Sequence, residues 1–115
     1  MSKKETKVYL AHARDCCARV IEYTRDGPHS LFDDPKTQDA VLRNLELIGQ
    51  CFKDANLILL EGDYPEIPWR DIAAFRNILA HAYLGVELKM VWDIIEHQVQ
   101  PLHAQLDQIL ENWNP

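Results

Sequence analysis

Apolar side chains recur at spacings of three and four residues in four stretches of the chain, and glycine or proline separates these stretches. This spacing places the apolar side chains on one face of an α-helix. No stretch alternates apolar and polar residues as a half-buried strand does. The pattern therefore predicts an all-α protein, an antiparallel bundle of four to five helices joined by short connections.

The expected helices are bounded by local signals. They cover residues 6–25, 35–61, 69–83 and 88–113. Asp34 followed by Pro35 is typical of a capped helix start, and Pro68 and Gly85 bound the third stretch. Pro101 lies inside the fourth stretch and lacks a backbone N–H, so we expect a kink or a split there.

The 115 residues, with 47% hydrophobic and 26% charged side chains, are typical of one globular domain spanning residues 1–115. The apolar runs are shorter than the roughly 20 residues of a membrane span, and the first residues resemble no signal peptide. We therefore expect a cytoplasmic protein with no membrane partner. Three cysteines without a CxxC pair, Cys16, Cys17 and Cys51, are interpreted as reduced core thiols, and neither a metal nor another cofactor is expected.

The segment from Trp69 to Tyr83 carries the most informative side chains. Projected at about 100° per residue, five apolar residues share one sector that we expect to be buried, namely Ile72, Phe75, Ile78, Leu79 and Ala82. Arg76, Asn77 and His81 fall opposite, on a face otherwise made of alanines. A merely solvated face more often carries lysine and glutamate. This face is therefore predicted to bind a ligand or a second subunit.

Arg76 and His81 are separated by about 140° around an ideal helix, so one copy cannot easily direct both side chains at a single atom. Two copies can do so. When this face packs on itself across a two-fold axis, both pairs converge in one cleft. The spacing therefore favours a homodimer with a composite Arg/His site.

The stretch Arg76-Asn77-Ile78-Leu79-Ala80-His81-Ala82-Tyr83 resembles the Arg-x4-6-His signature of HEPN ribonucleases, in the Arg-Asn-x3-His-x-Tyr form of the HepT-like toxins. Residues 40–49 and 65–70 resemble the same family, so the likeness covers most of the chain. It implies an all-α homodimer that cleaves RNA without a metal ion. It also implies a minimal nucleotidyltransferase antitoxin as partner, which silences the toxin by transferring AMP to the tyrosine of the motif, here Tyr83.

The residue types suit this chemistry, because RNA supplies its own 2′-hydroxyl nucleophile. We hypothesise that His81 is the general base or acid, that Arg76 binds the scissile phosphate, and that Asn77 orients His81 or the phosphate. Two simpler interpretations stay open: His81 could be a surface histidine, and Arg76 could form a salt bridge to Glu46 or Asp71. Asn44 and Glu46 are candidates for the cleft or the dimer interface.

The leading hypothesis is an endoribonuclease toxin that cleaves tRNA or mRNA. A net charge of −6 is the wrong sign for holding nucleic acid by bulk electrostatics, so RNA contacts must be local. The same charge favours an alternative from another class, a non-catalytic helical dimer that docks a nucleotidyltransferase partner. The Arg76 and His81 pair favours the enzyme, because a docking surface needs no titrating base beside a phosphate-binding cation.

Overall fold

The computed structural model describes residues 2–81 and 87–113, with the backbone alone for residues 80 and 81. No strand occurs within these ranges. The helices are α1 (Lys3–Tyr23), α2 (Pro28–Phe32), α3 (Pro35–Asp54), α4 (Leu57–Asp63), α5 (Trp69–His81), α6 (Leu88–Ile94), the π-helical segment η1 (Ile95–Val99) and α7 (Gln100–Glu111). The all-α prediction is confirmed, although the described residues form more helical segments than the four to five expected.

Helix α1 forms where the sequence predicts it and begins slightly earlier. The Ser2 hydroxyl accepts a hydrogen bond from the Glu5 backbone N–H at 3.1 Å, which satisfies one of the donors that a helix start leaves free. After the helix ends, Gly27 adopts a φ of 103°, a left-handed conformation that glycine accepts without strain. The chain can therefore turn sharply into α2, which forms within the predicted connection and buries Leu31.

Helix α3 begins as expected, with the Asp34 side chain accepting from the Lys36 backbone N–H and Pro35 in the first turn. The prediction of one continuous helix up to Gly62 is wrong. At Ala55 the backbone becomes extended, with a ψ of 173°, and the Asn56 side chain then accepts from the Leu59 N–H to cap α4. Because the apolar spacing continues across the break, the sequence pattern did not indicate that Asn56 caps a second helix.

The helix is irregular near Pro101, but the backbone stays helical through the region and does not split into separate helices. The π-helical segment η1 ends two residues before the proline and lies between α6 and α7. Proline has no N–H to donate and its ring crowds the preceding turn, so the regular hydrogen-bond ladder is disrupted there. The C-terminal stretch therefore departs from a regular α-helix within η1.

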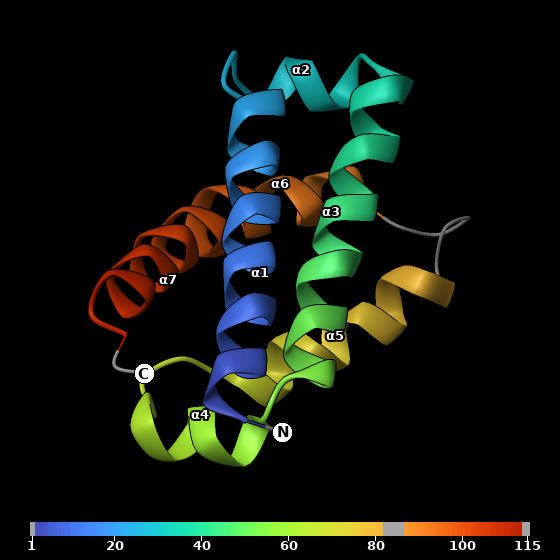
Figure 1. Cartoon of the computed structure of the whole chain (residues 1–115). Helices are drawn as coiled ribbons and strands as arrows, with labels where there is room; N and C mark the ends of the chain where they lie inside the picture. Colours follow the sequence, from blue (N-terminus) through green and yellow to red (C-terminus); the bar gives the residue numbers. More distant parts are fainter. Residues whose placement is uncertain (1, 82–86, 114–115) are drawn as a thin grey trace.

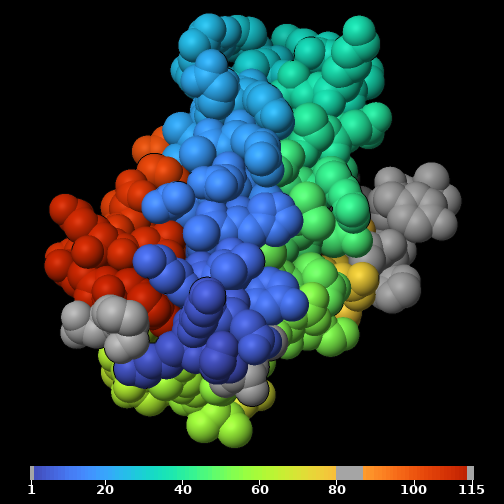
Figure 2. Space-filling model, in the orientation of Figure 1, coloured from blue at the N-terminus to red at the C-terminus, as the bar shows by residue number. Residues whose placement is uncertain are grey.

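The core lies between antiparallel α1 and α3, with α7 packed against α1 and α5 against α3 (Figure 1). In the space-filling view, α1 and α3 form the front face, and α7 projects beside them (Figure 2). At the base, Trp69 is buried in edge-to-face contact with Phe52, with ring centroids 4.9 Å apart. The Trp69 indole N–H donates to the Tyr64 carbonyl at 2.8 Å. These contacts anchor the start of α5, the helix that carries the candidate site.

None of the described helices combines the length and apolar character that a bilayer span requires.

Candidate functional site

The first turn of α5 is held in place from two sides. Trp69 is anchored in the core as described above. The neighbouring Arg70 Nε lies 2.9 Å from both carboxylate oxygens of Glu61 on α4. Because the pair joins two helices, it helps to set the direction in which α5 leaves the core. Arg76 and Asn77 follow about two turns later on this helix.

The Arg76 side chain is half-buried, and its contacts are few. Its Nη1 donates to the Asn77 Oδ1 at 3.2 Å, while its Nε is shielded from water and has no hydrogen-bond partner. Within residues 2–81 and 87–113, no carboxylate forms an ion pair with it. The salt bridge to Glu46 or Asp71 that the sequence left open is therefore not formed, and the positive charge of Arg76 is not neutralised by a neighbour there.

The face of α5 that meets the core differs from the projected one. Ala73, expected to face outward, is 7% exposed, whereas Ile78, expected to be buried, is 54% exposed. Leu79 is buried as predicted, and Asn77 is exposed as predicted. Arg76 is not fully outward but lies against α3 at Gly49. The helix has this orientation because Gly49 has no side chain, so the Arg76 face can approach α3 closely.

The two other residues of the motif are described only in part or not at all. His81 is the last residue of α5, and its side chain lies outside the described part of the structure. Tyr83 lies outside the described residues altogether. The structure thus brings Arg76 and Asn77 together. The meeting of Arg76 with His81, and the role of Tyr83, stay predictions.

The two candidate cleft residues on α3 make their contacts within that helix. Asn44 is buried, and its Nδ2 donates to the Ala40 carbonyl at 2.8 Å. Glu46 is partly buried and lies 3.7 Å from the Arg43 Nη1. Among the described side chains, neither forms a hydrogen bond or ion pair with Arg76. Their proposed place in a cleft or dimer interface therefore stays a prediction.

Two features next to Arg76 were missed by reasoning from the sequence. One is Gly49, whose position inside a predicted helix was a usable signal, because glycine there is about 1 kcal/mol less favourable than alanine. The other is a groove of about 290 Å³ between α3, α5 and the C-terminal helices, lined by Ile48, Ile72 and Phe75 among others. No sequence spacing indicates the groove, since it is formed by elements far apart in the chain.

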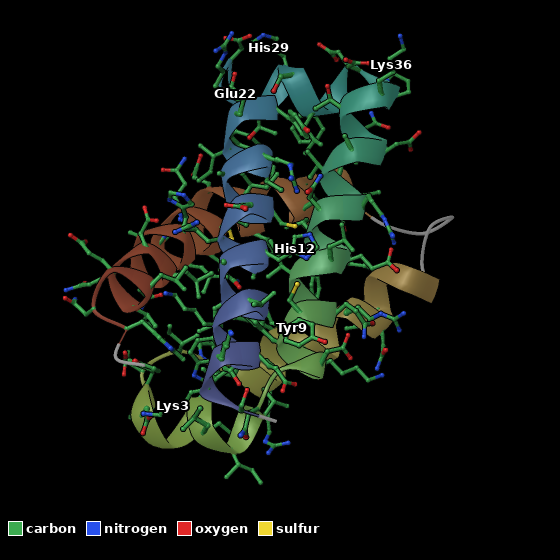
Figure 3. All side chains as sticks on the ribbon, in the orientation of Figure 1. Lys3, Tyr9, His12, Glu22, His29 and Lys36 are labelled. Carbon is green, nitrogen blue, oxygen red and sulfur yellow. The ribbon has the colours of Figure 1, made fainter. Side chains whose placement is uncertain are left out.

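The cysteines form a buried group between α1 and α3. All three are free thiols, as predicted, and Cys51 Sγ lies 3.5 Å from the His12 Nδ1 (Figure 3). Burial raises the pKa of Cys17 and of Cys51 to about 12. Both thiols therefore stay protonated near neutral pH and are poor nucleophiles. In the part of the chain that the structure describes, no cluster of histidine, cysteine and acidic side chains is arranged to hold a metal ion.

Comparison with known proteins adds independent information. The family model described as Ribonuclease HepT-like matches residues 13–109. A "Gamma-glutamylcyclotransferase and putative RNase" of Methanocaldococcus jannaschii is 34% identical over 95% of this chain, which spans only 49% of that protein. A "Putative RNase" of the same organism is 31% identical over 97% of this chain and 93% of its own length. "Probable ribonuclease HepT" of Thermococcus cleftensis is 33% identical over 93% of this chain and 97% of its own length.

No solved structure gives a significant match to the chain. The family model nevertheless covers most of the sequence and includes all of α5, and the described structure is helical throughout its regular elements. On this basis the chain belongs to the HepT-like ribonuclease family of the HEPN superfamily.

Proposed function

We propose that this chain is a metal-independent endoribonuclease that cleaves tRNA or mRNA at a site composed of Arg76 and His81 from two subunits. Membership of the HepT-like ribonuclease family supports the reaction class. The main support for this site comes from the contacts of the Arg76 side chain. Its guanidinium is held by Asn77 and lacks a carboxylate partner among the described residues, so its charge is available to a phosphate.

The proposed reaction begins with the 2′-hydroxyl of the RNA. His81 takes the 2′-hydroxyl proton as the 2′-oxygen forms a bond to phosphorus. The bond from phosphorus to the 5′-oxygen breaks, and an imidazolium gives that oxygen a proton. Arg76 stabilises the negative charge that gathers on the phosphorane oxygens. The products are a 2′,3′-cyclic phosphate and a 5′-hydroxyl end, and no metal ion takes part.

The contact between Asn77 and Arg76 suggests a role for Asn77. The sequence left open whether it orients His81 or the phosphate, and the structure has its Oδ1 accept a hydrogen bond from Arg76. We assign Asn77 the task of orienting the Arg76 guanidinium. Because Nη1 is engaged in this way, the remaining N–H groups of the fork are those left for phosphate oxygens.

A homodimer is part of the proposal, because Arg76 and His81 lie five positions apart on one helix. Exposed Ile78 supports it, since a large apolar side chain left in water on α5 is typical of a surface that another chain covers. In the dimer, the two copies of α5 face each other and form one cleft.

The resemblance to HepT-like toxins supports two further elements of the proposal. The chain acts as the toxin of a toxin–antitoxin pair, and a minimal nucleotidyltransferase antitoxin silences it by transferring AMP to Tyr83. Added AMP introduces bulk and negative charge, which would repel an RNA phosphate from the Arg76 cleft. Co-expression with the antitoxin is expected to raise the intact mass by one or more AMP groups, and Tyr83→Phe is expected to abolish the increase.

A second candidate function is a non-catalytic dimer that docks a nucleotidyltransferase. Exposed Ile78 and the apolar groove lined by Ile72 and Phe75 favour it, because both are suited to a protein partner. The two functions differ in what they require of the polar residues. Docking depends on the apolar surface and tolerates the loss of the His81 imidazole. Cleavage requires the imidazole.

A cleavage assay tests the proposal. It compares the purified wild type with His81→Ala and Arg76→Ala, each incubated with total tRNA and excess EDTA. We expect cleavage by the wild type and losses of about 100-fold or more in each variant. Arg25→Ala is the matched control, because it removes an exposed arginine just after α1 whose ion pair among the described residues is with Glu22. Absence of cleavage by the wild type, or equal cleavage by all four proteins, would contradict the enzyme and favour docking.

A further inference from the structure

Gly49 marks a point where α3 and α5 approach each other closely. A Cβ atom added to Gly49 would lie 2.5 Å from the Arg76 Cβ, 3.1 Å from the Ile72 carbonyl oxygen and 3.3 Å from the Arg76 Cα. These are backbone atoms or the first side-chain atom, so none can rotate away. A side chain at Gly49 therefore requires α5 itself to move.

The contrast with Gly62 shows that this crowding is specific to one glycine. Gly62 also lies in a helix, α4, but a Cβ added there would meet nothing within 4 Å. Glycine is less favourable than alanine in both positions, because it costs more backbone entropy to order. Of these two glycines, only Gly49 lies where the packing leaves no room for a side chain.

The residue that packs against Gly49 is Arg76, the proposed phosphate-binding arginine. The Arg76 Cα and Cβ lie against α3 at Gly49, the Nε is shielded from water, and Nη1 donates to Asn77. The start of the side chain is thus fixed by the contact with α3, and its outer end is directed by a neighbour on α5. Such confinement reduces the number of conformations that an arginine loses when it binds a ligand.

We propose that Gly49 is a positioning residue: by permitting the close approach of α3 and α5, it sets where the Arg76 guanidinium meets the RNA phosphate. The inference rests on the proposed function, since it acts through Arg76. It assigns a role in the reaction to a buried residue of α3 that bears no functional group and touches no substrate.

The first test compares Gly49→Ala with Gly62→Ala. Ordinary contact between carbon atoms needs about 3.5–4.0 Å, so the methyl group at Gly49 displaces the Arg76 segment by about 1 Å. A misplacement of that size can reduce a rate by about 100-fold, and we expect that loss in cleavage of total tRNA. Gly62→Ala is expected to cleave at the wild-type rate. Wild-type cleavage by a folded Gly49→Ala protein would overturn the inference.

The second test asks whether Gly49 acts through Arg76. In a His81→Ala background, which leaves the RNA intact, we expect Gly49→Ala and Arg76→Ala to weaken tRNA binding to similar extents. Adding both substitutions is expected to weaken it no further than Arg76→Ala alone. A purely structural effect on the fold would instead multiply the two losses, and that result would contradict positioning.

A third variant covers the case in which Gly49→Ala does not fold. Arg76→Gly removes the Cβ that the new methyl group overlaps most, so Gly49→Ala combined with Arg76→Gly is expected to recover helical circular dichroism. If the double variant also stays unfolded, Gly49 serves folding alone and the inference fails. Failure of the proposed function is a separate outcome: Arg76→Ala would then cleave as the wild type does.

Discussion

Arg76 is a charged residue whose inner and outer parts have different surroundings. Its Nε is buried without a partner, and its Nη1 contacts Asn77. An unsatisfied buried donor costs about 1–3 kcal/mol, more when charged. The cost falls on the inner part of the guanidinium, while the outer N–H groups that Asn77 does not engage are those left for a phosphate. At the scale of a single residue, the site is therefore partly desolvated before RNA arrives.

Arg76→Lys tests whether the planar fork matters as well as the charge. Lysine keeps the positive charge but offers a single ammonium in place of paired N–H groups, and it cannot keep the Asn77 contact in the same geometry. We expect cleavage of total tRNA to fall to about a tenth or less of the wild-type rate. Full activity in this variant would show that charge alone is sufficient.

The buried thiols predict a dependence of stability on pH. The pKa of Cys17 rises from 9.0 to about 12 on folding, so between these values the unfolded chain loses a proton that the folded chain keeps. The thiol's contribution is complete below pH 9.0, and stability falls as the pH rises towards 12, by about 1 kcal/mol per unit for this group. Urea unfolding across that range is expected to show a shallower decline for Cys17→Ala. Parallel slopes in the two proteins would contradict a protonated thiol.

At the scale of elements, a side-chain cap fixes where α3 begins. Asp34 caps α3 twice over: its Oδ1 accepts from the Lys36 N–H at 3.0 Å, and its Oδ2 accepts from the Thr37 hydroxyl at 2.9 Å. Helix α3 in turn packs against both α1 and α5. A weaker start to α3 therefore affects the stability of the whole bundle.

Asp34→Ala is expected to lower the free energy of unfolding by about 1 kcal/mol, because the first turn loses its side-chain acceptor. Asp34→Asn is the matched control, since its carbonyl oxygen can still accept the Lys36 N–H. Thermal or urea denaturation followed by circular dichroism measures both. Equal losses in the two variants would show that the charge of Asp34, and not its cap, carries the effect.

At the scale of the whole molecule, the proposed dimer depends on the apolar surface that α5 exposes. Ile78 is 54% exposed on α5, the helix whose Ile72 and Phe75 line the groove. Ile58 on α4 is even more exposed, at 79%, but lies on another helix. The proposed dimer covers Ile78 and brings the two copies of Arg76 and His81 together.

Ile78→Asp is expected to convert the dimer to a monomer in size-exclusion chromatography with light scattering, because a buried unpaired carboxylate opposes association. Cleavage of RNA should be lost in the same variant. Ile58→Asp is the control, and it should keep both the dimer and the activity. A wild-type protein that is already monomeric and active would refute the composite site.

Much of the fold follows from rules that operate over a few residues. The apolar spacing, the caps at Ser2 and Asp34, the turn at Gly27 and the disruption before Pro101 depend on neighbours in the chain, so the sequence by itself determined an all-α bundle. The candidate residues are readable for the same reason, since Arg76 and Asn77 share a motif on one helix. The break at Ala55 was missed because the apolar stripe continues through it.

Tertiary structure alone decided which face of α5 enters the core. Helix geometry determines which residues share a face. Which face is buried depends on the shape of the surface against which the helix packs. Here that surface contains Gly49, which draws the Arg76 side of α5 against α3 and leaves Ile78 in water. Because packing joins residues distant in the chain, the half-buried state of Arg76 follows from the contact between the helices and not from the motif that contains it.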